Sequence, residues 1–200
     1  MKQIFNIDGE VYSFLQKIYQ MMLLNLLIIF SSLPIITVPC ALITGYQLLK
    51  EYNQQEVTLT KYFMLFRKNL ILSFRLIIPF WVIFFLLFLL LAFTRRTIFQ
   101  FLILLFIAFF IVFLSNVFIV CTSQMSIRSI VEFSLGITLK YVGCNIIGLA
   151  IMLSSFVLPV FLPRLALVWA LFGISIPMVF QVMIHKQIMK HVTTNQIEQE

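Results

Sequence analysis

Long stretches without a charged side chain are the feature of this sequence that most restricts its fold. Five such runs, of 32, 19, 31, 23 and 20 residues, cover positions 18–49, 76–94, 97–127, 141–163 and 165–184. A helix that crosses the roughly 30 Å hydrocarbon core of a bilayer needs about 20 apolar residues. Each run therefore reaches or approaches the length of a membrane span.

The overall composition agrees with this interpretation. Hydrophobic residues make up 62% of the chain and charged residues 10%, against roughly 25% charged in an ordinary soluble domain. The mean hydropathy of +1.08 excludes a soluble enzyme, a disordered chain and a small disulfide-linked secreted module. Because lipid offers no partner to unpaired backbone groups, we expect an all-α fold, a polytopic helical membrane bundle.

The first run is too long for one helix and is interrupted by prolines. As a straight helix its 32 residues would extend about 48 Å. Pro34 and Pro39 each remove a helix hydrogen bond and restrict the preceding residue. They predict a helical hairpin over residues 11–52, with a turn from Pro34 and a returning helix from Pro39, whose ring suits the first helical position. The returning helix has about nine apolar positions, so re-entrant insertion and burial inside the bundle are both open.

The basic residues favour this hairpin over a single first span. With the hairpin and a cytoplasmic N-terminus, 11 of the 14 basic residues fall on the cytoplasmic side, whereas a single first span would leave nine inside and five outside. Cytoplasmic loops carry the excess of Lys and Arg, so we expect a multi-pass protein of the bacterial plasma membrane with both termini in the cytoplasm. The inside set is Lys2, Lys17, Lys50, Lys61, Arg67, Lys68, Arg75, Arg128, Lys140, Lys186 and Lys190, and the outside set is Arg95, Arg96 and Arg164.

The whole chain, residues 1–200, is predicted to form a single integral membrane domain. Thr58 is expected to cap an amphipathic cytoplasmic helix at the membrane interface over residues 58–70. Membrane helices are predicted over 71–93, 98–120, 139–158 and 162–186, with a polar tail over 193–200. Together with the hairpin these give five full spans plus the short returning helix, and the segment from Cys121 to Lys140 is expected on the cytoplasmic side.

The apolar runs contain few groups that could carry chemistry. They hold no Asp, Glu or Lys, which argues against a carrier driven by protons or ions. His185 and His191 are six residues apart, about 240° around a helix, whereas a metal pair needs a shared face. Three scattered cysteines show no metal or disulfide spacing, and no glycine-rich loop would hold a nucleotide. We therefore expect no enzyme, no metal and no cofactor.

Three basic residues are candidate contacts for a partner or a lipid. Arg67 and Lys68 lie in the expected interfacial helix, beside a leaflet that carries anionic lipid, and they also suit docking of a cytoplasmic partner. Arg75 lies a few residues into the apolar stretch that ends at Phe93, and its long side chain can reach back to the interface. Contact of Arg75 with a substrate or a lipid phosphate is the alternative. The net charge of +7 follows from this location and does not indicate nucleic-acid binding.

Small and polar residues predict how the helices pack. Ala41 with Gly45, and Ala166 with Ala170, are pairs of small residues four positions apart, which let helices approach closely. Five polar side chains in the apolar runs suit hydrogen bonds between helices: Asn25, Thr44, Asn116, Asn145 and Gln181. Internal packing is the favoured interpretation, and a polar path for a solute or contact with a partner protein are the alternatives.

Aromatic residues are expected at the surface of the bundle. Most of the 23 phenylalanines are predicted to face lipid, with a partner-helix interface as the alternative. Amphipathic rings collect at membrane–water interfaces, and the residues expected to anchor there are Tyr12, Tyr19, Tyr46, Tyr52 and Trp81.

The segment around the two prolines resembles a known family. The specific similarity covers about residues 20–70, and the succession of membrane segments extends it over nearly the whole chain. The stretches that look like the opening of the YesL-like family of bacterial membrane proteins are Asn25–Leu27, Ser32–Ala41 (SLPIITVPCA), Tyr46, and Phe63-x-x-Phe66-Arg67-x-Asn69. That family has no assigned molecular activity, and its members are found beside ATP-driven carbohydrate uptake systems. The resemblance therefore implies a context and not a reaction.

Two hypotheses of function follow. The first is a non-enzymatic accessory or assembly partner of a carbohydrate uptake system, in contact with the permease subunits of an ATP-driven sugar importer. The second is a small passive transporter or channel that works as a homo-oligomer. This second function would need a continuous polar face through several helices.

Overall fold

The computed structural model describes residues 10–51, 57–94, 97–121, 125–162, 164 and 166–197. Within these ranges every regular element is a helix, which confirms the all-α class. The elements are α1 (Glu10–Ser31), the short 3₁₀ helix η1 (Ile35–Thr37), α2 (Val38–Glu51), α3 (Leu59–Phe93), α4 (Thr97–Val120), α5 (Ile127–Lys140), α6 (Val142–Phe161), α7 (Ala166–Phe172) and α8 (Ser175–Ile197).

Three helices in the described part of the chain are long and apolar enough to cross a membrane. They are Val11–Ser31 within α1, all of α3, and Ile98–Val120 within α4. Helices α5 and α6 are bent by 100° relative to each other. Together they are apolar enough to add a fourth candidate if the bent pair forms one broken span. The described part of the chain is therefore all-helical with three or four candidate membrane spans, which suggests a membrane protein and does not confirm the five full spans predicted.

The predicted hairpin is present. Helix α1 ends at Ser31, and the chain turns through Pro34 and η1 into α2, with the Thr37 hydroxyl donating to the Pro34 carbonyl at 2.6 Å. Pro39 is the second residue of α2 and not the first, but it is still within the first turn, where backbone N–H groups have no intrahelical acceptor. Ten of the 14 residues of α2 are buried, so the short returning helix lies inside the protein. Tyr52, its expected end, falls outside the described residues.

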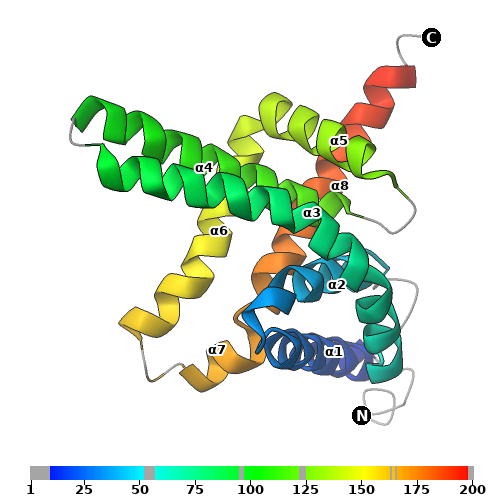
Figure 1. Ribbon diagram of the computed structural model, residues 1–200. Helices are drawn as coiled ribbons and strands as arrows, with labels where there is room; N and C mark the ends of the chain where they lie inside the picture. The colour runs from blue at the N-terminus through cyan, green and yellow to red at the C-terminus, as the bar shows by residue number, and fades with distance from the viewer. Residues whose placement is uncertain are drawn as a thin grey trace.

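Helix α3 differs from the prediction of an interfacial helix at 58–70 followed by a span at 71–93. It is continuous over 35 residues, because nothing in the sequence between these two segments interrupts a helix. Thr58 is the N-cap, as predicted, and its hydroxyl accepts from the Lys61 N–H at 3.4 Å. Pro79 lies inside α3, and Figure 1 shows the helix changing direction near its middle, which is the usual effect of an internal proline.

The chain after α4 contains a helix that was not predicted. Ser126 caps α5, and its hydroxyl accepts from the Ser129 N–H at 3.2 Å. Helix α5 buries one stripe: Ile130, Ser134, Ile137 and Thr138. The chain turns sharply at Tyr141, so that the predicted helix at 139–158 begins only at Val142.

The last predicted span, 162–186, is divided in two. Helix α7 ends at Phe172 and α8 begins at Ser175, with Gly173, a poor helix former, at the break. Helix α8 continues to Ile197, so most of the expected polar tail, 193–200, is helical, and residues 198–200 fall outside the described chain. The turn at Arg95 and Arg96 also lies outside it.

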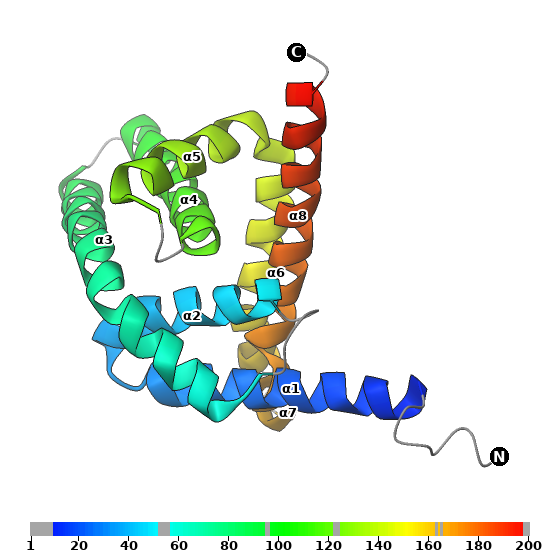
Figure 2. The same ribbon diagram turned by 90° about the vertical axis from the view of Figure 1, so that its right-hand side faces the viewer.

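Helix α2 is the centre of the fold. It contacts α1, α3, α4 and α8, while α5 lies against α4 and α6 packs beside α8 (Figure 1). Figure 2 shows α1 lying across the lower ends of α6 and α8 and not alongside them, so the helices do not form a simple up-and-down bundle. Most side chains are exposed over residues 82–93 at the end of α3 and 98–106 at the start of α4. Figure 1 shows these two helices extending from the body as an arm. We call this segment the arm.

Candidate functional site

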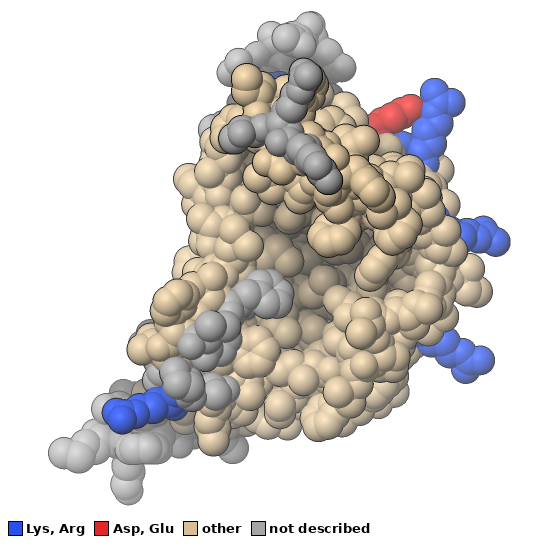
Figure 3. Space-filling view, turned by 60° about the vertical axis from the view of Figure 1, so that its left-hand side comes forward, with Lys and Arg blue, Asp and Glu red and all other residues tan. Residues whose placement is uncertain are grey.

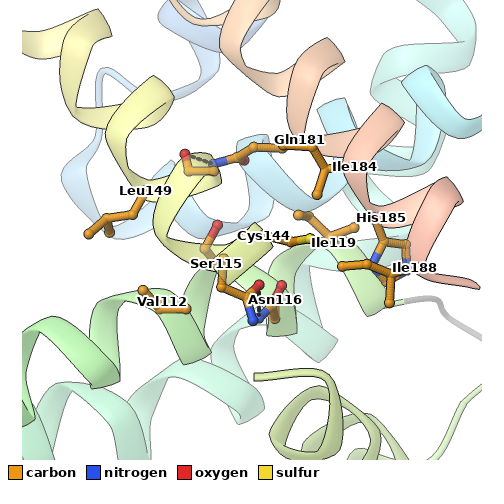
Figure 4. Close-up of a pocket in the computed structure, with 12 residues that line it drawn as sticks. Val112, Ser115, Asn116, Ile119, Cys144, Leu149, Gln181, Ile184, His185 and Ile188 are labelled. Atoms are coloured by element: carbon orange, nitrogen blue, oxygen red, sulfur yellow. Dashed lines mark hydrogen bonds between the residues drawn. The ribbon is translucent and has the colours of Figure 1, made fainter. Parts of the chain in front are cut away.

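The candidate site is a small pocket between α4, α6 and α8 (Figure 4). Its volume of about 20 Å³ is enough for about one water molecule. Six of the lining residues are polar or carry a thiol: Ser115, Asn116, Cys144, Asn145, Gln181 and His185. No carboxylate and no amine lines the pocket, so it presents amide, hydroxyl, imidazole and thiol groups only.

Two asparagines on one side of the pocket join three helices. The Asn116 amide on α4 donates to the Thr138 hydroxyl of α5 at 2.9 Å and to Asn145 Oδ1 of α6 at 3.0 Å. The Asn145 amide in turn donates to the carbonyls of Ile137 at 3.2 Å and Thr138 at 3.3 Å. The two side chains therefore fix the sharp turn between α5 and α6 against α4.

Gln181 closes the other side of the pocket, as Figure 4 shows. Its amide on α8 donates to the Gly148 carbonyl of α6 at 3.2 Å, and its Oε1 accepts from the Tyr46 hydroxyl of α2. Tyr46, expected as an interfacial anchor, is instead buried, with 2% of its surface exposed. This prediction was wrong because a hydroxyl partner from α8 makes burial of the ring favourable.

His185 is the unusual member of the lining. Only 7% of the residue is exposed, and its buried Nδ1 has no hydrogen-bond partner. An unpartnered buried polar atom costs about 1–3 kcal/mol, and the pocket beside it has room for a water molecule that would satisfy it. The pattern of two histidines six apart indicated only interfacial positions, and the side chain of His191 lies outside the described part.

A second polar group lies on the other side of α2. The Asn69 amide of α3 donates to Gln47 Oε1 at 2.8 Å and to the Thr44 hydroxyl at 3.3 Å. The Gln47 amide donates to the Cys121 carbonyl at 3.2 Å, and the Lys50 amine donates to the Ile119 carbonyl. These donors from α2 satisfy carbonyls at the C-terminal end of α4, which have no partner within their own helix.

Asn25 joins α1 to the break between α7 and α8. Its amide donates to the Ala170 carbonyl at 2.7 Å, and its Oδ1 accepts from the N–H groups of Ile174 at 2.8 Å and Ser175 at 2.9 Å. A side chain from a distant helix thus caps the start of α8. Residues 149 and 150 positions apart meet here, which no local sequence pattern signals.

The small residues expected at helix contacts are placed as follows. Ala41 is fully buried on α2. A Cβ on Gly45 would lie 2.8 Å from Cδ1 of Ile28 and 2.9 Å from Cε of Met178, so α1, α2 and α8 meet closely there. Ala170 faces Asn25 through its carbonyl; Ala166 is the first residue of α7, and its side chain lies outside the described part.

The three basic candidates, Arg67, Lys68 and Arg75, are all exposed on α3 and are far in the sequence from the pocket lining. The structure therefore brings the five polar candidates into helix contacts but leaves the basic ones at the surface. Sequence reasoning missed Gln47 and His185 as buried groups and used Asn69 only within the family resemblance. An amide in an uncharged run was the available signal for Gln47, whereas Asn69 directly follows Arg67 and Lys68 and gave no such signal.

Metal binding has no support among the residues described, because no group of three or more His, Cys, Asp or Glu side chains lies together.

Comparisons of the chain with protein-family models, with curated proteins and with solved structures find no match. The resemblance to the YesL-like family therefore stays a prediction from residues 20–70.

Proposed function

We propose that this chain is a non-enzymatic accessory or assembly subunit in the bacterial plasma membrane, with both termini in the cytoplasm. The observation that carries the proposal is the contrast between the inner polar groups and the arm. The polar candidates inside the protein are engaged with neighbouring helices, as in Asn116 with Asn145, whereas the arm exposes phenylalanines such as Phe85 at 61% and Phe101 at 66%. The arm therefore offers a large apolar surface to lipid or to another membrane protein, and contact with such a partner is the use that we propose for it.

The outer surface supports this proposal. Figure 3 shows a hollowed face made of uncharged side chains, with the visible Lys and Arg residues at its margins. An apolar groove of about 300 Å³ is lined by residues of η1, α2, α3 and α4, among them Pro39, Trp81 and Phe110. Both features suit packing against lipid or an apolar helix. The identity of the partner, a permease subunit of an ATP-driven carbohydrate importer, is taken from the sequence resemblance alone.

Affinity purification of the tagged protein from native membranes in mild detergent, followed by mass spectrometry, tests the proposal. We expect permease or sugar-binding subunits of an importer in near-stoichiometric amounts. Recovery of the chain as a homo-oligomer without any partner would contradict an accessory role.

A small homo-oligomeric passive transporter is the second candidate, and the pocket beside His185 is the observation that favours it. Its volume of about 20 Å³ is far below that of a sugar, so transport would require the pocket to open. Replacing Asn116 and Asn145 by Leu would remove the polar lining between α4 and α6. Loss of solute flux in liposomes containing the folded variant would support transport, and unchanged flux would exclude this route.

A further inference from the structure

The N-terminal half of α3 has an exposed stripe of alternating apolar and basic side chains. Phe63, Arg67, Ile71 and Arg75 follow one another at intervals of four residues, and Met64 and Lys68 run beside them. All six are exposed. The opposite side of the same helix is buried: Tyr62, Asn69, Ser73 and Leu76. We call the six exposed residues the basic stripe.

The basic stripe carries three cations without any acidic neighbour on its helix. The sequence from Val57 to Thr94 contains no Asp or Glu. Lys61, one turn earlier, is paired with Glu51 at 2.8 Å, but no ion pair or hydrogen bond engages the side chains of Arg67, Lys68 or Arg75 within the described part of the chain. The stripe therefore complements an anionic surface.

The length of α3 places this stripe at the edge of the bilayer. The uncharged residues 76–93 of α3 extend about 27 Å, which nearly fills a hydrocarbon core of roughly 30 Å. The preceding half of α3 must then lie outside the core. Pro79 takes away the helix hydrogen bond of the Arg75 carbonyl, and the change of direction in α3 (Figure 1) lets this half lie along the interface.

The apolar members of the stripe distinguish a membrane from a soluble partner. Met64 and Ile71 are each 64% exposed, and they flank the basic residues on the same side of α3. An interfacial helix inserts such side chains below the headgroups while its Lys and Arg reach the phosphates. An acidic protein would have to bury these apolar groups as well as match the charges.

We propose that the basic stripe is a binding site for the phosphate headgroups of anionic phospholipid, with Arg67, Lys68 and Arg75 as its contacts. This site would fix the depth and angle of α3 in the membrane. It does not depend on which protein the arm contacts, so it can fail or hold independently of the accessory role.

Native mass spectrometry of the full-length protein, incubated with equal amounts of phosphatidylglycerol and phosphatidylcholine of matched chains, tests the site. The test variant is Arg67→Gln/Lys68→Gln/Arg75→Gln. The control, Arg128→Gln/Lys140→Gln/Lys186→Gln, removes the same charge from exposed positions elsewhere. Each basic residue near an anionic surface is worth roughly fivefold in binding, so three amount to on the order of 100-fold.

We expect the wild type and the control to retain phosphatidylglycerol preferentially and the test variant to lose that preference. Equal retention of the two lipids by the wild type, or equal loss in both triple variants, would overturn the proposal. So would an unchanged preference for phosphatidylglycerol in the test variant. If an acidic protein that co-purifies with the wild type were also lost from that variant, the stripe would be assigned to that protein. If the test variant does not fold, cross-linking of the wild type with a photoactivatable phosphatidylglycerol must label residues 63–75; labelling only elsewhere would also overturn it.

Discussion

Helix α2 and the arm differ in composition and have opposite surroundings: α2 carries Thr44, Gln47 and Lys50, whereas the arm is almost wholly apolar. Ten of the 14 residues of α2 are buried, and Thr44, Tyr46 and Gln47 each hydrogen-bond to another element. In the arm Phe88 is 60% and Phe93 82% exposed, and among the described residues no side-chain hydrogen bond joins the arm to α2. The difference shows that the buried helix combines apolar packing with hydrogen bonds to its neighbours, as at Ile43 and Gln47, whereas the arm has apolar surface alone.

The physical reason is the membrane itself. Lipid tails are as apolar as leucine, so apolar side chains gain little by leaving lipid for another helix. Hydrogen bonds and close backbone approach then set the packing, as they do around Asn25 and Gly45. A helix surface without such groups is available to lipid or to another protein.

The largest effect is expected from removing the cap at the start of α8. Asn25→Ala leaves the N–H groups of Ile174 and Ser175 without an acceptor, and each unsatisfied buried donor costs about 1–3 kcal/mol. We expect a loss of about 3 kcal/mol in the free energy of unfolding, measured by denaturation of the purified protein in detergent micelles. Leu15→Ala, at a residue of the same helix that is 57% exposed, is the control and should change it by less than about 0.5 kcal/mol. Equal losses in both variants would show that the hydrogen bonds from Asn25 to the start of α8 do not stabilise the fold.

Overfilling the contact around α2 should have the next effect. Gly45→Leu forces a side chain between Ile28 and Met178 and is expected to cost about 2 kcal/mol. Gly45→Ala should cost much less, because the two atoms that its Cβ meets are the ends of flexible side chains. A Cβ on Gly136 meets nothing within 4 Å, so Gly136→Ala should be neutral or stabilising by up to about 1 kcal/mol. A Gly45→Leu variant with wild-type stability would mean that α1, α2 and α8 do not meet as described.

The coupling between Asn116 and Asn145 should be smaller. A double-mutant cycle with Asn116→Ala and Asn145→Ala is expected to give an interaction energy of about 0.6–1.7 kcal/mol, the range for hydrogen bonds between membrane helices. Asn25 and Asn116 belong to separate groups, and their cycle should be additive within about 0.5 kcal/mol. Additivity in the first cycle would show that α4 and α6 are not joined at this point.

The smallest effect on stability is expected in the arm. Replacing Phe85, Phe88 and Phe101 by Ala removes side chains that are 60–66% exposed, and each change should stay within about 0.5 kcal/mol. Thermal unfolding in detergent measures this. A large loss would show that the arm is part of the folded core and would remove the contrast with α2.

The sequence predicted the class of fold and the polar helix contacts better than the boundaries of the elements. Asn25, Thr44, Asn116, Asn145 and Gln181 stood out because each is costly in an apolar run unless it is partnered. The break before α8 could not be predicted, since its cap comes from α1, 149 residues away. The burial of Tyr46 depends in the same way on Gln181.

Partner recovery, compared between variants of exposed phenylalanines inside and outside the arm, tests the central claim most directly. The tagged wild type, the Phe85→Ala/Phe88→Ala/Phe101→Ala variant and a control with three exposed phenylalanines changed outside the arm (Phe14, Phe30 and Phe180, each to Ala) would be purified from native membranes in mild detergent. Co-purified protein would be quantified per folded chain. We expect the arm variant to lose its partner with an unchanged unfolding midpoint, while the control keeps it. Full recovery with the arm variant, or equal loss in the control, would contradict the assignment of the arm as the contact surface.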